Sequence, residues 1–136
     1  MSSSDFELQK AVYSTLTQYA ALSALVGDAV YDSVPDDATF PRVALGESDF
    51  QRGDIGCIAG GTAYLTLHAW SVEPGSTEVK QVAGAVEDAL HQKPLTLSNH
   101  RVVTVDHRYT QTMRDADGLT SHAVINFAVI LEKASS

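Results

Sequence analysis

The feature that most constrains the fold is a strict alternation of residue types over positions 62–72. One side of this segment would carry Ala63, Leu65, Leu67 and Ala69, and the other would carry Tyr64, Thr66, His68 and Trp70. Because successive side chains of a β-strand point to opposite faces of a sheet, the pattern predicts a strand with one apolar face. Such a face has to be covered by another layer of secondary structure.

Two segments have the helical periodicity expected of a covering layer. Ser76 is suited to begin a helix that Pro94 would end, and apolar residues recur along it at spacings of 3, 4, 7 and 11. This stripe consists of Val79, Val82, Ala83, Val86 and Leu90. Near the start of the chain, Ser4 and Glu7 have the spacing of a capping box, which predicts a helix to about residue 19. Residues 20–26 would continue that helix or form a second short one.

Three further segments have the composition of strands, residues 42–50, 101–110 and 122–132. Alternation predicts that one face is shared by Val103, Val105, His107 and Tyr109 in the second of them, and by Ile125, Phe127, Val129 and Leu131 in the third. Asp117 and Gly118 between these two strands are the turn signal of a hairpin. Residues 30–31 could form a short pairing at the edge of the sheet.

The order of the main elements is therefore helix, strand, strand, helix, strand, strand. Short loops between consecutive strands favour antiparallel neighbours. The sequence predicts one α+β domain over residues 1–136, in which two helices pack on one face of a four-stranded, mainly antiparallel sheet. Residues 1–4 and 134–136 are expected to be disordered.

The charge of the chain is strongly acidic, at −8, with nine basic residues against 17 acidic ones. Binding to phosphate backbones depends on clustered Lys and Arg, and the basic residues here are scattered, which argues against a nucleic-acid-binding surface. Solubility explains the charge most simply. If the protein formed a ring through which DNA passes, an acidic lumen would repel DNA and let it slide. No segment has the length of a membrane span, so no membrane partner is expected.

The sequence contains no motif of an enzyme or of a metal site. None of the five histidines has HExxH spacing; His68 and His107 could approach across the sheet, as hydrogen-bonded or exposed side chains. The single cysteine, Cys57, lacks a CxxC partner. The glycines of residues 51–61 form neither a phosphate-binding loop nor a dinucleotide fingerprint. We therefore expect no catalytic residue, no metal ligand and no cofactor.

Two features favour a protein that works by contact with other proteins. The long loops 51–61 and 110–121 would project from the same edge of the sheet if the strands form two neighbouring hairpins, and exposed loops commonly carry contact surfaces. Tyr64 and Trp70 would lie on the face opposite the helices, where either a neighbouring subunit or a loop of the same chain could cover them. The candidate interface residues are Tyr64, Trp70, Arg52, Asp54, Ile55, Met113, Arg114 and Asp115.

The segment 23–47 contains an ordered series of apolar, Gly and Pro positions. A helix closes at Leu25-Val26-Gly27, a short extended piece follows at Val30-Tyr31-Asp32, and Pro35 and Pro41 lead into the strand at Arg42. Gly27 stands where a helix C-terminus favours a residue that tolerates positive φ. In this pattern, and in the elements around it over residues 6–131, the chain resembles the tail terminators, or tail-completion proteins, of long-tailed phages and gene transfer agents.

The resemblance implies a structural role in a particle. Tail terminators assemble into a ring, typically a hexamer, on the head-proximal end of the tail tube, stop its polymerisation and offer the surface to which the head attaches. The partners implied are further copies of the chain, the tail tube protein and the head–tail connector, with DNA passing through the channel without sequence-specific binding. The protein would occur in the host cytoplasm during assembly and then in the particle. Two alternatives remain open, a head-completion or connector protein of the same particle and an unrelated small dimeric α+β binding protein.

Overall fold

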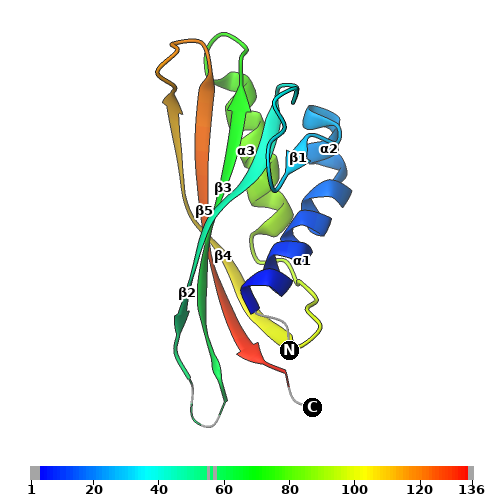
Figure 1. Cartoon of the computed structure of the whole chain (residues 1–136), viewed down its shortest axis with the longest axis vertical. Coiled ribbons are helices and arrows are strands. Elements are labelled where there is room, and N and C mark those ends of the chain that lie inside the picture. Colours follow the sequence, from blue (N-terminus) through cyan, green and yellow to red (C-terminus); the bar gives the residue numbers. More distant parts are fainter. Residues whose placement is uncertain (1–3, 55, 57, 135–136) are drawn as a thin grey trace.

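The computed structural model describes residues 4–54, 56 and 58–134, which form one layer of helices on one layer of sheet (Figure 1). The elements in chain order are α1 (Ser4–Gln18), α2 (Ala20–Val26), β1 (Val30–Tyr31), β2 (Arg42–Arg52), β3 (Gly60–Ser71), α3 (Thr77–Leu90), β4 (His100–Arg114) and β5 (Ser121–Lys133). The strands lie in the order β1-β2-β3-β5-β4. Of residues 1–4 and 134–136, at which we expected disorder, residues 1–3, 135 and 136 lie outside the described residues. The expectation is wrong for the other two, because Ser4 begins α1 and the Ala134 N–H donates to the Asn99 carbonyl at 3.1 Å.

The α+β class is confirmed, but the element count differs from the prediction of four strands and two helices. Tyr19 has an extended conformation (φ −83°, ψ 112°), so residues 20–26 form a separate helix rather than a continuation of α1. Gly27 closes α2 with a φ of 65°, as its position predicted. The short edge pairing at residues 30–31 is real: β1 runs parallel to β2, whereas the other neighbours are antiparallel.

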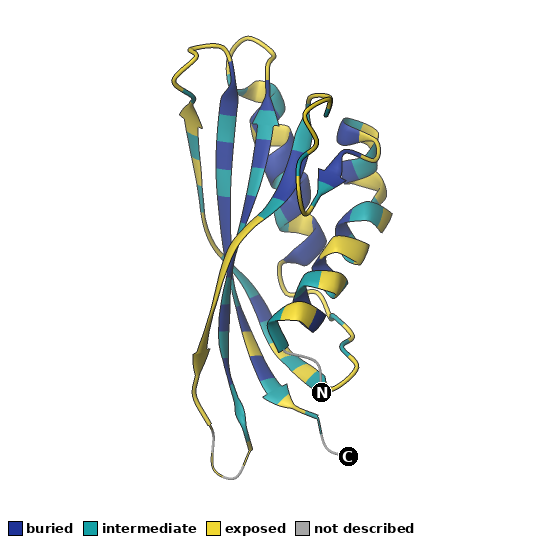
Figure 2. Ribbon diagram, viewed as in Figure 1, coloured by how far each residue is buried: buried dark blue, intermediate teal, exposed yellow. Residues whose placement is uncertain are grey.

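The core lies between the helices and one face of the sheet, where the buried residues gather (Figure 2). The apolar stripe of α3 is buried in full, with relative exposures of 0–2%. The inward faces predicted for β3 and β5 are also correct, since Ala63, Leu65, Leu67, Ala69, Ile125, Phe127, Val129 and Leu131 are all buried. These strands keep the period of two because they pair with each other in uninterrupted register from Gly60 to Ser71.

The face predicted for β4 is wrong. Two register shifts against β5, one between Val102 and Thr104 and one between His107 and Tyr109, interrupt the alternation. As a result Val103 and Tyr109 are 49% and 46% exposed, although Val105 is buried. A β-bulge inserts an extra residue into one strand, and this changes the face of everything that follows it.

The predicted capping box at Glu7 is also wrong. Ser4 lies within α1, and the buried Glu7 carboxylate accepts hydrogen bonds from the Asn99 backbone N–H at 2.8 Å and the Asn99 side chain at 3.0 Å. Glu7 therefore ties α1 to the connection between α3 and β4, which is a long-range contact that no local motif predicts.

The two loops that we expected to project from the same edge lie at opposite ends of the sheet (Figure 1). The β2–β3 loop adjoins the end of β5, where the Lys133 N–H donates to the Ala59 carbonyl at 2.8 Å. The β4–β5 turn adjoins the end of β3, because Ser121 pairs with Ser71. The reason is topological: β3 and β5 are antiparallel neighbours, so the start of one lies beside the end of the other.

Candidate functional site

The most organised surface of the molecule is the sheet face turned away from the helices, which we call the open face. On β3 it carries Tyr64, Thr66, His68 and Trp70, which alternate with the buried residues of the same strand. The register places Ala128, Asn126, Val124 and His122 of β5 beside these four residues in the same order. A regular strand pairing therefore collects side chains far apart in sequence into one surface.

A chain of four hydrogen-bonding groups crosses the open face at one end. The His68 Nδ1 lies 2.8 Å from the His122 Nε2, and the His68 Nε2 lies 2.8 Å from a Glu47 carboxylate oxygen. At the far side, the His122 Nδ1 lies 3.4 Å from an Asp115 carboxylate oxygen. The order acid, histidine, histidine, acid joins β2, β3, β5 and the β4–β5 turn.

Trp70 completes this cluster by stacking on both histidines. Its ring centre lies 5.6 Å from that of His68 and 5.0 Å from that of His122, with interplanar angles of 16° and 19°. The Arg42 guanidinium lies 5.4 Å from the Trp70 ring centre and 4.0 Å from that of Phe40, in cation–π geometry. Trp70 is thus partly covered by residues of its own chain.

The surroundings of His122 disfavour its protonated form. Burial and the neighbouring His68 lower the pKa of His122, although Asp115 opposes the effect. The hydrogen bond from His68 lowers the pKa of Glu47. No group of three or more His, Cys, Asp or Glu side chains within the described residues is arranged to hold a metal ion. The arrangement can therefore hold side chains of three strands and of the β4–β5 turn in fixed positions and respond to pH, and it offers no nucleophile next to a base.

A second polar group occupies the middle of the open face. Arg108 donates to the Asn126 side-chain oxygen at 2.8 Å, and Asn126 donates to the Thr66 hydroxyl at 3.1 Å. The Arg108 guanidinium also lies over the Tyr64 ring, 4.9 Å from its centre. Alternation from His107, which packs on Phe127, places Arg108 on this face, and the second β4 bulge brings Tyr109 to the same face, level with Asn126. The bulge thus sets Tyr109 beside Arg108, whose guanidinium lies 5.9 Å from the Tyr109 ring centre.

The structure separates the residues predicted as an interface. Tyr64 and Trp70 lie on the open face, whereas Arg52 and Asp54 form an exposed ion pair of 3.3 Å at the β2–β3 loop. Met113, Arg114 and Asp115 lie at the opposite end, where Met113 pairs with His122. Ile55 lies outside the described residues. Among the described candidates, Trp70 and Asp115 lie close to the same residue: Trp70 stacks on His122, and the His122 Nδ1 lies 3.4 Å from an Asp115 carboxylate oxygen.

Glu47, Arg42 and His122, which build the cluster, were not among the residues predicted from the sequence. The predicted approach of His68 to His107 is wrong, because His107 packs on the other face against the Phe127 ring, with centres 5.5 Å apart. The position of His122 could have been predicted from the alternation of side chains along β5. His122 is an odd number of residues away from the buried Ile125 and Phe127, so its side chain points to the opposite face of the sheet, which is the open face.

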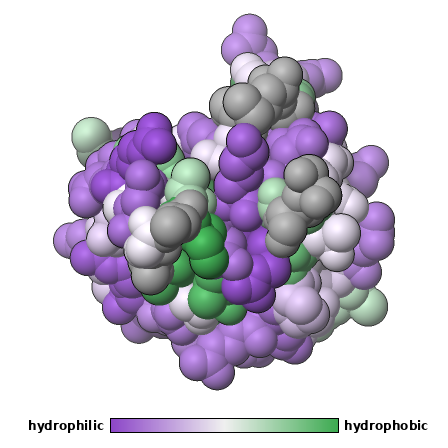
Figure 3. All heavy atoms as spheres, turned by 90° about the horizontal axis from the view of Figure 1, so that it is seen from below, coloured by the Kyte–Doolittle hydropathy of each residue, from purple (hydrophilic) through white to green (hydrophobic). Residues whose placement is uncertain are grey.

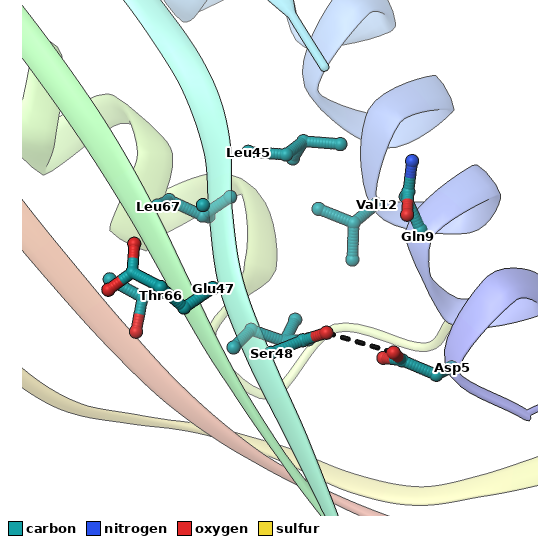
Figure 4. A pocket seen from close by; sticks show the side chains of 10 residues that line it. Asp5, Gln9, Val12, Leu45, Glu47, Ser48, Thr66 and Leu67 are labelled. Atoms are coloured by element: carbon teal, nitrogen blue, oxygen red, sulfur yellow. Dashed lines mark hydrogen bonds between the residues drawn. The ribbon is translucent and has the colours of Figure 1, made fainter. Parts of the chain in front are cut away.

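The pocket between α1 and β2 does not suit a small-molecule ligand. The pocket between α1 and β2 is lined by Asp5, Gln9, Val12, Leu45 and Ser48 among others, and Ser48 donates to Asp5 across it at 2.9 Å (Figure 4). Its volume of about 30 Å³ suits a water molecule, whereas ligand pockets hold roughly 300–1,000 Å³.

The end of the molecule that carries the β2–β3 loop shows a small apolar group among mostly hydrophilic atoms (Figure 3). Within the part of the chain that the structure describes, none of the helices is both long and apolar enough to cross a membrane.

Comparison with known proteins finds similar chains in particles of a gene transfer agent and a bacteriophage. A chain in the virion of a native gene transfer agent particle superposes with a TM-score of 0.90 at 30% identity, over 97% of this chain and 99% of that one. The gp17 protein of bacteriophage SPP1 shares the fold, with a TM-score of 0.60 at 22% identity over 96% of this chain and 91% of that one. Among curated proteins there is no significant match. Residues 10–132 match the family described as tail completion protein gp17, and the chain therefore belongs to that family.

Proposed function

We propose that this protein forms a closed ring, of six subunits, on the head-proximal end of a tail tube. The ring stops polymerisation of the tube and provides the surface to which the filled head attaches through its connector protein. The observation that carries this proposal is the match to the tail completion family over residues 10–132. The likeness to a chain of a gene transfer agent virion along nearly the whole of both chains supports it.

The mechanism is steric and geometric. One face of the ring is complementary to the last ring of tube subunits, and the other face lacks the surface that would accept a further tube subunit. A heterologous contact whose rotation closes produces such a ring from identical chains. The net charge of −8 suits a channel through which DNA slides, because the lumen repels phosphates.

The open face is the surface that we assign to contacts with particle proteins. Tyr64 and Trp70 give it aromatic area, and fixed hydrogen bonds hold the side chains around them in one arrangement. Aromatic residues with fixed neighbours are typical anchors of protein interfaces, because little side-chain entropy is lost on binding. The contact is with the tail tube or a neighbouring subunit.

Deleting the gene in the particle-producing cell tests the proposal, with the tails imaged by electron microscopy. A terminator predicts overlong or ragged tubes beside tailless, DNA-filled heads, and a plasmid copy of the gene should restore complete particles. Tails of normal length beside separate heads would instead favour the head-connector alternative. Normal particles would contradict both, and a discrete dimer without affinity for the tube protein would then favour the small binding protein.

A further inference from the structure

His68 and His122 form a hydrogen-bonded pair that is mostly buried, with an acid at each end. The two histidine side chains are each 17% exposed, whereas those of Glu47 and Asp115 are 77% and 38% exposed. The facing nitrogens, His68 Nδ1 and His122 Nε2, lie 2.8 Å apart. The acids are thus the solvent-facing ends of this chain of groups, and the contact between the two rings lies between them.

The three distances along the chain of groups show where its protons lie. An ionised carboxylate only accepts hydrogen bonds, and a neutral imidazole has one N–H and one bare nitrogen. His68 therefore donates from Nε2 to Glu47, at 2.8 Å, and its bare Nδ1 accepts from the His122 Nε2–H. The His122 Nδ1 is then bare, and this nitrogen faces Asp115 at the longer distance of 3.4 Å. The geometry is that of two neutral imidazoles, each with its proton on Nε2.

Further protons act on this pair in two different ways. A proton added to the bare Nδ1 of His122 lets that ring donate to Asp115 and breaks no existing hydrogen bond. A second added proton, at the Nδ1 of His68, places an N–H on both facing nitrogens and a positive charge on both rings. Two donors cannot bond to each other, and like charges this close repel. Acid therefore breaks the hydrogen bond between the rings, and neutral pH restores it.

The charged groups around the pair set how much acid this takes. Glu47 of β2 and Asp115 of the β4–β5 turn favour protonation, whereas the Arg42 guanidinium, which lies over the Trp70 ring, opposes it. β4 adds no charge at this level, because its residue paired with His122 is a methionine. Burial also lowers the pKa of His122. The second charge therefore enters the pair only well below pH 6.5, which is about the ordinary pKa of histidine.

Trp70 depends on both rings of the pair. It stacks on His68 and on His122, with interplanar angles of 16° and 19°. Separation of the two rings removes at least part of this packing. It also breaks the link between Glu47 and Asp115, so that the β2 bulge and the β4–β5 turn are no longer joined across the face.

We propose that His68 and His122 are a pH-operated lock on the open face. Near neutral pH their hydrogen bond holds Trp70 in place and joins the β2 bulge to the β4–β5 turn. In acid the doubly charged pair separates, and the face loses this fixed arrangement. The consequence for binding rests on the proposed contact of the open face with particle proteins. Affinity for tail tubes should fall about tenfold or more when the lock opens, because a disordered face has to be ordered again on binding.

Nitrogen NMR of the full chain, labelled with ¹⁵N at histidine, tests the lock directly. At about pH 8 both rings should show the Nε2–H tautomer, and a scalar coupling through the hydrogen bond should join His68 Nδ1 to His122 Nε2. On titration to about pH 4 the coupling should vanish together with a change in the fluorescence of Trp70, the only tryptophan of the chain, while circular dichroism stays that of the folded protein. Absence of the coupling at the higher pH, or its persistence when both rings are charged, would overturn the lock.

Three substitutions separate the lock from general effects of acid. Asp115→Asn removes a charge that favours the protonated pair, so loss of the coupling should move to lower pH by about 0.5 unit. His68→Gln removes the pair, and Trp70 fluorescence should then change only when the chain unfolds. His91→Gln is the matched control, since His91 is exposed and follows α3, and it should leave the transition in place. A fluorescence transition that persists in His68→Gln would show that the pair does not cause it.

Sedimentation with tail tubes from cells that lack the gene links the lock to the proposed function. Wild type and His91→Gln should bind at neutral pH and lose affinity over the range in which the coupling vanishes, whereas His68→Gln should bind weakly throughout. Binding that stays tight after the lock has opened would overturn its role in the contact. If the wild type binds the tubes at no pH, the proposed function fails instead, and the NMR result still decides on the lock.

Discussion

At the scale of single residues, Gly46 shows how an absent side chain makes room for the histidine cluster. A Cβ built at Gly46 would lie 2.5 Å from the His68 ring and 2.8 Å from the Thr66 carbonyl oxygen. The backbone contact cannot rotate away, so we expect Gly46→Ala to lower the free energy of unfolding by about 1–3 kcal/mol. Gly84→Ala in α3 is the matched control, because no atom lies within 4 Å of its added Cβ, and it should raise stability by about 0.5–1 kcal/mol. Urea titration measures both, and equal effects of the two substitutions would contradict the close approach.

His122 gives the fold a pH dependence whose sign follows from its surroundings. Its pKa is lowered by burial and by His68, while Asp115 and Glu47 oppose that effect. The unfolded chain therefore takes up a proton near its ordinary pKa of about 6.5 that the folded chain resists, and stability falls as the pH drops through and below that value. Replacing His122 with Asn should flatten this part of the profile. Thermal unfolding between about pH 8 and pH 5 measures the slope, and an unchanged slope in the variant would show that another group causes it.

At the scale of secondary-structure elements, Glu7 holds α1 against the connection that leads into β4. Hydrogen bonding from the Asn99 backbone lowers the pKa of Glu7 to about 2 from its ordinary 4.5. A lowered carboxyl pKa means that the ionised form stabilises the fold, fully above about pH 4.5, and that this stabilisation is lost as the pH falls towards 2. Glu7→Gln should lower the melting temperature at neutral pH, and its difference from the wild type should shrink over this acid range. Asp88→Asn, on an exposed part of α3, is the control; a constant Glu7→Gln difference down to pH 2 would rule out the ionised carboxylate as the cause.

The elements also show which parts of the fold are predictable from sequence. The inward faces of β3, β5 and α3 follow from local periodicity, because each element keeps one period along its length. The bulges of β2 and β4 are set by pairing with a neighbouring strand, so residues 46–47 and 103–109 show no local sign of them. The histidine cluster depends on that same pairing: His68 and Trp70 were visible as one face, but Glu47 and His122 meet them only through register.

At the scale of the whole molecule, the open face and the two ends of the sheet are separate surfaces. We assign the open face to contacts with the tail tube or a neighbouring subunit. The β2–β3 loop and the β4–β5 turn lie at opposite ends of the strands, so the two ends of the molecule present different surfaces. A protein that ends a tube on one side and receives a head on the other needs this asymmetry.

Trp70 tests whether the open face makes contact in the particle. Trp70→Ala removes the ring that stacks on His68 and His122, so we expect a loss of about 1–3 kcal/mol in stability and a large loss of complete particles. Trp70→Phe keeps an apolar ring and should recover most of the stability, so particle yield and stability can be separated. Both variants are compared at a temperature where each remains folded, by counting tailed particles under the electron microscope. If Trp70→Ala completes particles as well as the wild type at that temperature, the tryptophan serves only the sheet itself, and the contact has to lie elsewhere on the open face or at the strand ends.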